Sequence, residues 1–390
     1  MRKRIEIKDM RQVATAEGAE IAYDLSIGQS QYELKYNISG ISGLHVPQRV
    51  DGVVVTFLLY ALRHDMDIVS VHPISEQLYF NITKNIIPQI VCCDKNAHDI
   101  KLIMPTTSEK LESSNRRGTG LSLGIDSFTT LHEYGEDALS DNYRLTDLVH
   151  LKTGAHHGMI GRFDKEVEDR LFHKENEKVR AYCKKYGHNL ITIETNLFEI
   201  TCKEFGWNFD TTHIVRNLGT IMVLQNYFDK YYYASAMNLD QFSINLSQAN
   251  AHMEKWLIPL LSTENVTFYS ANSAMNRVEK TEYISKFEDT YDHLHVCWHE
   301  EKNCGECAKC IRTLVALDAM GVLDKYAKSF DLEQYYKNRW KLIKRVVALR
   351  RRDTFYMEVY KLLKEKKVKV PNAIAVAFTY LSIRIKDVLT

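Results

Sequence analysis

The sequence has 390 residues, of which 45% are hydrophobic and 26% are charged, and its formal net charge is +1. A chain of this length ordinarily forms two or three domains, and a charge near zero excludes a general electrostatic attraction to nucleic acid. There is no run of about eighteen apolar residues and no apolar segment after the basic start. We therefore expect no membrane span and no signal peptide, and place the protein in the reducing cytoplasm.

The first 113 residues predict a small α+β domain. The segment "QYELKYNIS" alternates polar and apolar residues as a half-buried strand does, and residues 51–65 form an apolar run that is long enough for a buried helix. Cys92 and Cys93 end an apolar segment, which favours packing thiols over nucleophiles. We also expect strands over 67–71 and 98–105, a second helix over 74–91 and a polar linker over 106–120.

Residues 114–296 alternate regularly between strand and helix patterns, which predicts a parallel sheet with helices on both faces. Ligands of such sheets bind beyond the carboxyl ends of the strands. The predicted strands are "TGLSLG", "LTDLVHLKTG", "NLITIETN", "KYYYASAMN" and "NVTFYSAN", and the predicted helices cover 125–135, 163–187 and 211–228.

Residues 297–390 predict a cysteine-rich knuckle followed by a helical tail. The helix around "KNRWKLIKRVVALRRR" is strongly basic. This pattern fits a solvated helix face, and it also fits a contact for RNA or a protein partner, so both interpretations stay open.

The stretch "SLGIDS", residues 122–127, stands between a predicted strand and a predicted helix. Free backbone N–H groups and the helix dipole make such a position favourable for anions. The stretch lacks the Gly-Lys-Ser/Thr ending of a Walker A loop and the third glycine of a dinucleotide fingerprint. An ordinary strand-turn-helix with a capping Asp-Ser pair is the alternative interpretation.

This stretch resembles the "SGGxDS" loop of the PP-loop ATP pyrophosphatases, in which the loop holds the ATP phosphates and ATP is split into AMP and pyrophosphate. Ser122, Gly124, Asp126 and Ser127 match that pattern, and Leu123 replaces its first glycine. A side chain there restricts the approach of the backbone to phosphate, so whether Leu123 abolishes ATP cleavage stays open. The resemblance assigns ATP binding to Ser122, Leu123, Gly124, Ile125, Asp126 and Ser127.

Four of the eight cysteines gather in "CWHEEKNCGECAKC" as Cys297, Cys304, Cys307 and Cys310. Four thiolates complete a tetrahedral Zn²⁺ site with no place for water, which is the pattern of a structural site. An iron–sulfur cluster is the alternative, and His299 is a substitute ligand to consider.

Together the two motifs resemble the 7-cyano-7-deazaguanine synthase group, whose cysteine pattern is C-x8-C-x2-C-x2-C. Here the first spacing is six, and the resemblance covers residues 117–320, so the chain resembles a divergent relative. It implies the fold of the adenine-nucleotide alpha-hydrolases, also called the HUP fold, with ATP, Mg²⁺ and structural Zn²⁺. The implied reaction adenylates a carboxylate or amide-like oxygen on a small heterocyclic or peptide acceptor, which ammonia or another nucleophile then attacks.

The resemblance also assigns catalytic roles. Ser127 would donate to phosphate, and Asp126 would hold the loop or bind Mg²⁺. Arg277 and Lys280 resemble the basic positions that contact phosphate, and their i, i+3 spacing puts both on one helix face. A surface helix is the alternative.

Further polar residues follow predicted strands. Thr153 and Gly154 suit contact with adenine or ribose, and the substrate candidates are His156, His157, His213, Asn238 and Asp240.

Two other functions stay open. A sulfur transferase of the same fold would need a catalytic cysteine, for which Cys183 and Cys202 are the candidates in this segment. A degenerate, zinc-stabilised module would bind nucleotide, RNA or protein without catalysis. The sequence identifies neither the acceptor nor a homodimer contact.

Overall fold

The computed structural model describes residues 2–155, 164–206, 209–298 and 300–389. Two compact units make up the chain. The first comprises residues 1–121 and 130–273, and the second comprises residues 122–129 and 274–390. The stretch "SLGIDS" therefore belongs to the same unit as the C-terminal segment, although it directly follows a strand of the first unit.

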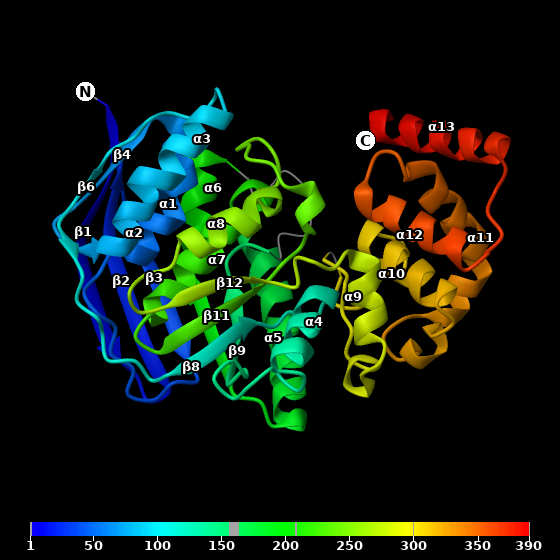
Figure 1. The fold of residues 1–390 in the computed structure, drawn as a ribbon, viewed down its shortest axis with the longest axis horizontal. Coiled ribbons are helices and arrows are strands. Elements are labelled where there is room, and N and C mark those ends of the chain that lie inside the picture. Colours follow the sequence, from blue (N-terminus) through cyan, green and yellow to red (C-terminus); the bar gives the residue numbers. More distant parts are fainter. Residues whose placement is uncertain (1, 156–163, 207–208, 299, 390) are drawn as a thin grey trace. The chain divides into compact units, whose positions relative to one another are not determined.

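The first unit contains a ten-stranded sheet in the order β12-β11-β8-β9-β10-β3-β2-β1-β4-β6 (Figure 1). Its strands β8 to β12 pair in parallel, as the alternating pattern predicted. From β8 the chain runs outward through β9 and β10 on one side, and later through β11 and β12 on the other. The order thus reverses between β8 and β11, which is where ligands of open α/β sheets bind. These strands are β8 (Arg116–Gly120), β9 (Asp147–Lys152), β10 (Leu190–Thr195), β11 (Phe228–Ala234) and β12 (Thr267–Ala271).

The expected separate domain over 1–113 does not appear, because its strands extend the same sheet. Strand β3 pairs antiparallel with β10, and Ser39 lies opposite Thr192. Gly40 permits this junction, since a Cβ there would lie 2.2 Å from the Leu190 carbonyl oxygen. The strands are β1 (Lys3–Ala14), β2 (Gly18–Ile27) and β3 (Ser30–Ser39) in antiparallel pairs, with β4 (Met66–Ser70) and β6 (Leu102–Ile103) in parallel, while β5 (Ile74–Ser75) pairs with β7 (Thr106–Thr107).

Helices flank this sheet, and the apolar α1 (Asp51–His64) packs closely against α7 (Phe209–Ile221). The approach is close because glycines face each other. A Cβ at Gly219 would lie 2.5 Å from the Gly52 carbonyl oxygen. The predicted helix over 74–91 is present as α2 (Glu76–Asn81), a π-helical turn (Ile82–Ile86) and α3 (Ile87–Cys93). The other helices are α4 (Ile125–Tyr134), which begins in the second unit, α5 (Lys165–Tyr186), α6 (Leu197–Phe205) and α8 (Glu254–Leu260), with 3₁₀ turns at Met222–Leu224, Leu239–Gln241 and Asn250–Met253.

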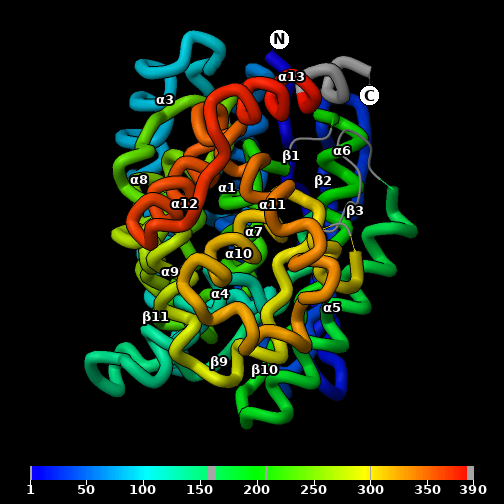
Figure 2. Tube along the Cα trace, turned by 90° about the vertical axis from the view of Figure 1, so that its right-hand side faces the viewer, coloured from blue at the N-terminus to red at the C-terminus, as the bar shows by residue number. Residues whose placement is uncertain are grey.

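The second unit is helical beyond the cysteine-rich segment, as predicted. Helix α10 (Ala308–Ala319) packs against α9 (Arg277–Ile284), α11 (Leu332–Leu349) and α12 (Thr354–Glu365), and α11 also contacts α13 (Ala373–Leu389) (Figure 2). Short 3₁₀ turns at Glu288–Thr290 and Leu323–Tyr326 connect them. Among the described residues, no helix has both the length and the apolar content that crossing a bilayer requires.

Candidate phosphate loop and metal centre

The "SLGIDS" loop leaves the carboxyl end of β8 and opens helix α4. The Ser127 hydroxyl closes the loop on itself: it accepts from the Gly124 amide at 3.1 Å and lies 3.4 Å from the Ser122 hydroxyl. Leu123 has a φ of 56°, so a buried leucine adopts the left-handed conformation at the position where the resembling family has glycine. Leu123 therefore adopts the left-handed backbone conformation that glycine adopts at little cost, although its side chain is bulky.

Both predicted basic residues contact the predicted acidic one. The Asp126 carboxylate lies 2.8 Å from Nη2 of Arg277 and 3.3 Å from Nζ of Lys280, whose side chain is only 1% exposed. Both cations come from α9. The Asn276 side chain caps that helix, and the Arg277 amide donates to Glu358 at 3.0 Å. The structure thus brings Asp126, Arg277 and Lys280 together at the start of α4.

Two further cations of α10 belong to this charged region. The pKa of Lys309 is lowered, first by desolvation of its ammonium group and then by the charge of Arg277, although the residue as a whole is exposed. The Arg312 guanidinium pairs with Asp353 at 3.0 Å and lies 4.6 Å from the centre of the Phe355 ring, which Arg277 also contacts at 5.3 Å. Sequence reasoning missed Lys309 and Arg312, although each stands two residues after a cysteine of the cluster.

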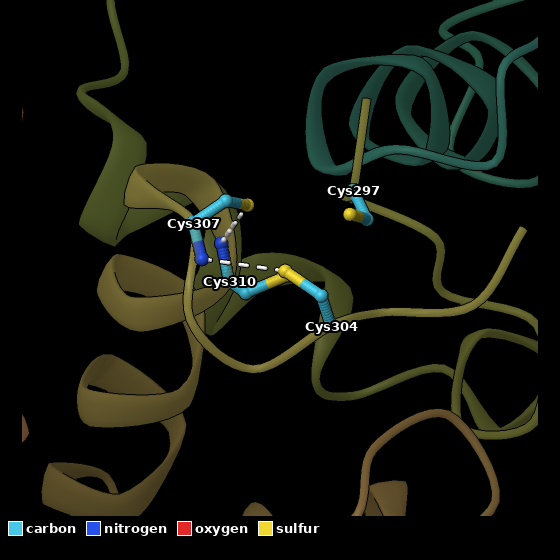
Figure 3. Close-up of side chains that lie close together, drawn as sticks. All are labelled: Cys297, Cys304, Cys307 and Cys310. Carbon is cyan, nitrogen blue, oxygen red and sulfur yellow. Dashed lines mark hydrogen bonds between the residues drawn. The ribbon is translucent and has the colours of Figure 1, made fainter. Parts of the chain in front are cut away.

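The four predicted cysteine ligands converge (Figure 3). The sulfur atoms of Cys297, Cys304, Cys307 and Cys310 all lie within 4.8 Å of one another. A tetrahedral zinc with Zn–S bonds near 2.3 Å needs sulfur atoms about 3.8 Å apart, so small movements suffice to hold the ion. A hydrogen bond with Cys297, followed by burial, raises the pKa of the Cys307 thiol to about 11, and a bound dication would reverse that effect.

Backbone amides shape the knuckle around these thiols. The Cys307 amide donates to Sγ of Cys304 at 3.3 Å, and the Cys310 amide donates to Sγ of Cys307 at 3.4 Å. Gly305 has a φ of 73°, which the tight turn between Cys304 and Cys307 requires. The cluster can therefore hold a structural zinc ion. His299 lies outside the described residues.

Asn303 fastens the two arms of the knuckle, and sequence reasoning missed it. Its side-chain oxygen accepts from the amides of Val296 and Cys297 at 2.8 and 3.1 Å, while its nitrogen donates to the carbonyls of Leu294 and Ser329. Next to this arm, the His295 amide donates to the Leu123 carbonyl at 2.9 Å. A continuous backbone route therefore links the cysteine cluster to the "SLGIDS" loop.

A separate polar group lies in the first unit. Thr153, which follows β9, donates to the side-chain oxygen of Asn217 at 2.5 Å. The Tyr233 hydroxyl lies 2.9 Å from Nδ1 of His213 and 3.4 Å from the side-chain nitrogen Nδ2 of Asn217. Two predicted residues, Thr153 and His213, thus share one network with two that were missed. The spacing of four between His213 and Asn217 on α7 was the available signal.

The other substrate candidates do not join that network in the described contacts. Asn238 accepts from Gln241 at 2.8 Å, and Asp240 is exposed. Their loop is instead fixed by Glu254, which accepts from the amides of Ala236 and Met237. Gly154 has a φ of 96° and faces the Phe198 ring. His156 and His157 lie outside the described residues.

Comparisons of the chain with protein-family models, with curated proteins and with solved structures gave no significant match.

Proposed function

We propose that this protein is a PP-loop ATP pyrophosphatase of the deazaguanine-synthase-like group. It would transfer AMP to a carboxylate or amide-like oxygen of a small heterocyclic or peptide acceptor and release pyrophosphate. The observation that carries the proposal is the meeting of Asp126, Arg277 and Lys280 at a self-closed loop that follows β8 in the chain.

The chemistry follows from these side chains. The hydroxyls of Ser122 and Ser127 and the first amides of α4 donate to phosphate oxygens, while Lys280 and Arg277 balance the negative charge of the leaving pyrophosphate. An acceptor oxygen attacks the α-phosphorus, and the bond from that phosphorus to the bridging oxygen breaks toward pyrophosphate. Ammonia or another nucleophile then attacks the activated carbon, and AMP leaves with the transferred oxygen. When bound, Mg²⁺ would supply further charge neutralisation to the pyrophosphate.

The cysteine cluster has no role in bond making in this scheme. Four thiolates fill the coordination sphere of zinc and leave no position for a substrate or a water molecule. Its contribution is structural, through the His295 amide that holds the Leu123 carbonyl.

The sulfur-transferase alternative is disfavoured by the two cysteines that it needs. Burial raises the pKa of Cys183 to about 12 and that of Cys202 to about 11, so neither forms much of the thiolate nucleophile near pH 7. Changing either residue to serine should leave pyrophosphate release intact. A loss of sulfur transfer in one of these variants would instead establish the alternative.

The deciding experiment is isothermal titration of the zinc-loaded protein with α,β-methylene-ATP and Mg²⁺. Ser127→Ala and Lys280→Ala should each weaken binding by about tenfold to hundredfold, the usual effect of losing a charge-assisted hydrogen bond. The control is Lys337→Ala, because Lys337 is an exposed lysine of α11 in the same unit. If the unchanged protein does not bind the analogue, the proposal is wrong, and salt-sensitive RNA binding then tests the binding-module alternative.

A further inference from the structure

Arg216, in the middle of α7, is fully buried. Among the residues that the structure describes, none of its three side-chain nitrogen atoms has a hydrogen-bond partner. The guanidinium carbon lies 4.7 Å from the centre of the Phe198 ring and 4.7 Å from the centre of the Phe209 ring. Such cation–π contacts do not use the N–H donors on the edge of the guanidinium.

Arg216 lies close to residues at or just after the carboxyl ends of two parallel strands. Phe198 lies in α6, directly after β10, and Tyr233 lies near the carboxyl end of β11 and contributes to the electrostatic environment of Arg216. His213 lies on the same face of α7 as Arg216, at i−3, and Asn217 is the next residue in the chain. Tyr233, His213 and Asn217 are half-buried, so solvent reaches the polar surface beside the guanidinium. This is the carboxyl edge of the parallel strands, where such sheets bind ligands.

A structural ion pair is the ordinary explanation for a buried arginine, and the contacts do not provide one. Glu168 of α5 is the carboxylate close enough to affect the charge of Arg216, together with Cys202 and Tyr60. No hydrogen bond joins Glu168 to the guanidinium among the described residues. Arg49 shows the contrast: it is also buried, but its Nη2 donates to the Glu109 carbonyl at 2.5 Å.

We propose that Arg216 binds an oxyanion of the acceptor substrate, a carboxylate or a phosphate group, with His213 and Asn217 beside it. The planar fork of a guanidinium matches two oxygen atoms of such a group, which is why arginine recognises carboxylates and phosphates in pairs of hydrogen bonds. The proposal rests on the proposed function and narrows its substrate class. The acceptor carries a permanent negative charge as an anchor.

The test measures binding of benzoate and phenyl phosphate by isothermal titration, with neutral benzamide as the uncharged probe. The phosphate loop is first saturated with α,β-methylene-ATP, so that phenyl phosphate cannot bind there, and a parallel series in the Lys280→Ala background omits the nucleotide. The variants are Arg216→Met, Arg216→Lys and, as a matched buried control, Arg49→Met. Thermal unfolding is recorded for each protein.

The unchanged protein should bind one or both oxyanions and not benzamide, and their relative affinity tells a carboxylate anchor from a phosphate anchor. Arg216→Met should lose about tenfold to hundredfold in affinity. It should also unfold at an equal or higher temperature, because it removes an unpaired buried charge. Arg49→Met should bind normally and unfold at a lower temperature, because it leaves the Glu109 carbonyl without its donor.

Opposite results overturn the proposal. A lower unfolding temperature in Arg216→Met with unchanged oxyanion binding makes Arg216 structural. The proposal is also wrong if the unchanged protein binds neither benzoate nor phenyl phosphate at up to about 10 mM. If Arg216→Met does not fold, the Arg216→Lys variant decides the question, because lysine keeps the positive charge but lacks the planar pair of N–H donors. Oxyanion binding that is no weaker in Arg216→Lys would contradict the proposal. If the unchanged protein binds the nucleotide but neither oxyanion, only the proposal for Arg216 fails. If it binds an oxyanion but not the nucleotide, only the proposed function fails.

Discussion

From the left-handed conformation of Leu123 we predict an unusual order of stability for two variants. At most buried positions the variant with glycine is less stable than the variant with alanine, because glycine loses more backbone freedom on folding. At Leu123, whose φ is 56°, we expect the reverse order. The two changes to compare are Leu123→Gly and Leu123→Ala, which remove nearly the same buried side chain.

The magnitudes follow from three terms. Leu123 is 1% exposed, and removing a buried leucine side chain costs about 2–5 kcal/mol in either variant. Alanine keeps the left-handed cost of about 1–2 kcal/mol, which glycine avoids. Glycine loses about 0.5–1 kcal/mol through its freedom in the unfolded chain. Leu123→Gly should therefore be more stable than Leu123→Ala by about 0.5–1 kcal/mol, although both are less stable than the unchanged protein.

The assay is urea unfolding of both variants beside the same pair at Leu314. Leu314 is an equally buried leucine of α10 in the same unit, in ordinary helical backbone. There the glycine variant should be less stable than the alanine variant by about 1 kcal/mol. If the two positions give the same order, Leu123 is not held in the left-handed conformation, and the explanation of the loop fails.

Three further predictions concern the metal centre and a buried acid. Removing zinc with a chelator should weaken α,β-methylene-ATP binding, because the His295 amide holds the Leu123 carbonyl, and unchanged affinity would separate the two sites. Asn303→Ala should cost about 1–3 kcal/mol in unfolding free energy and speed zinc release to a chromophoric chelator, whereas an unchanged release rate would contradict its fastening role. Burial raises the pKa of Asp51, so the folded state holds this proton more tightly than the unfolded chain does. Stability should then fall as pH rises from about 4 through the raised pKa, and Asp51→Asn should remove that part of the slope in thermal unfolding against pH.

The sequence predicted the elements whose apolar pattern is long and regular. Strands β8 to β12 and the helices of the tail were found this way. Strand β1 was missed because Ile5 and Ile7 are its only fully buried side chains, so most of its residues are polar or exposed. Helix α6 was missed because nine residues give too few turns for a helical period. The pairing of β3 with β10 depends on contacts between distant segments, which no local pattern records.

The candidate sites were likewise predictable where their residues are close in the sequence. The cysteines and the "SLGIDS" residues are close in sequence, so their spacing carries the signal, and the structure brings each set together. Lys280 and Asp126 are 154 residues apart, and only the family resemblance suggested that both belong to one site. Arg216 gave no recognisable motif. Its significance depends on the absence of an acceptor around it, which a sequence cannot display.

The division of the chain explains why a closed metal centre accompanies the phosphate loop. Residues 122–129 belong to the unit that contains α9 and the cysteines, although they continue from β8. Asp126 is held by two cations of α9, and the Leu123 carbonyl is held by the amide two residues before Cys297. A strained loop needs rigid partners, because its conformation persists only when surrounding contacts determine it. An ion held by the four thiolates, with no exchangeable position, would supply that rigidity without chemistry of its own. The cysteine cluster would thus serve the phosphate loop through backbone geometry, and the partners of the loop would be lost in any chain that ends before α9.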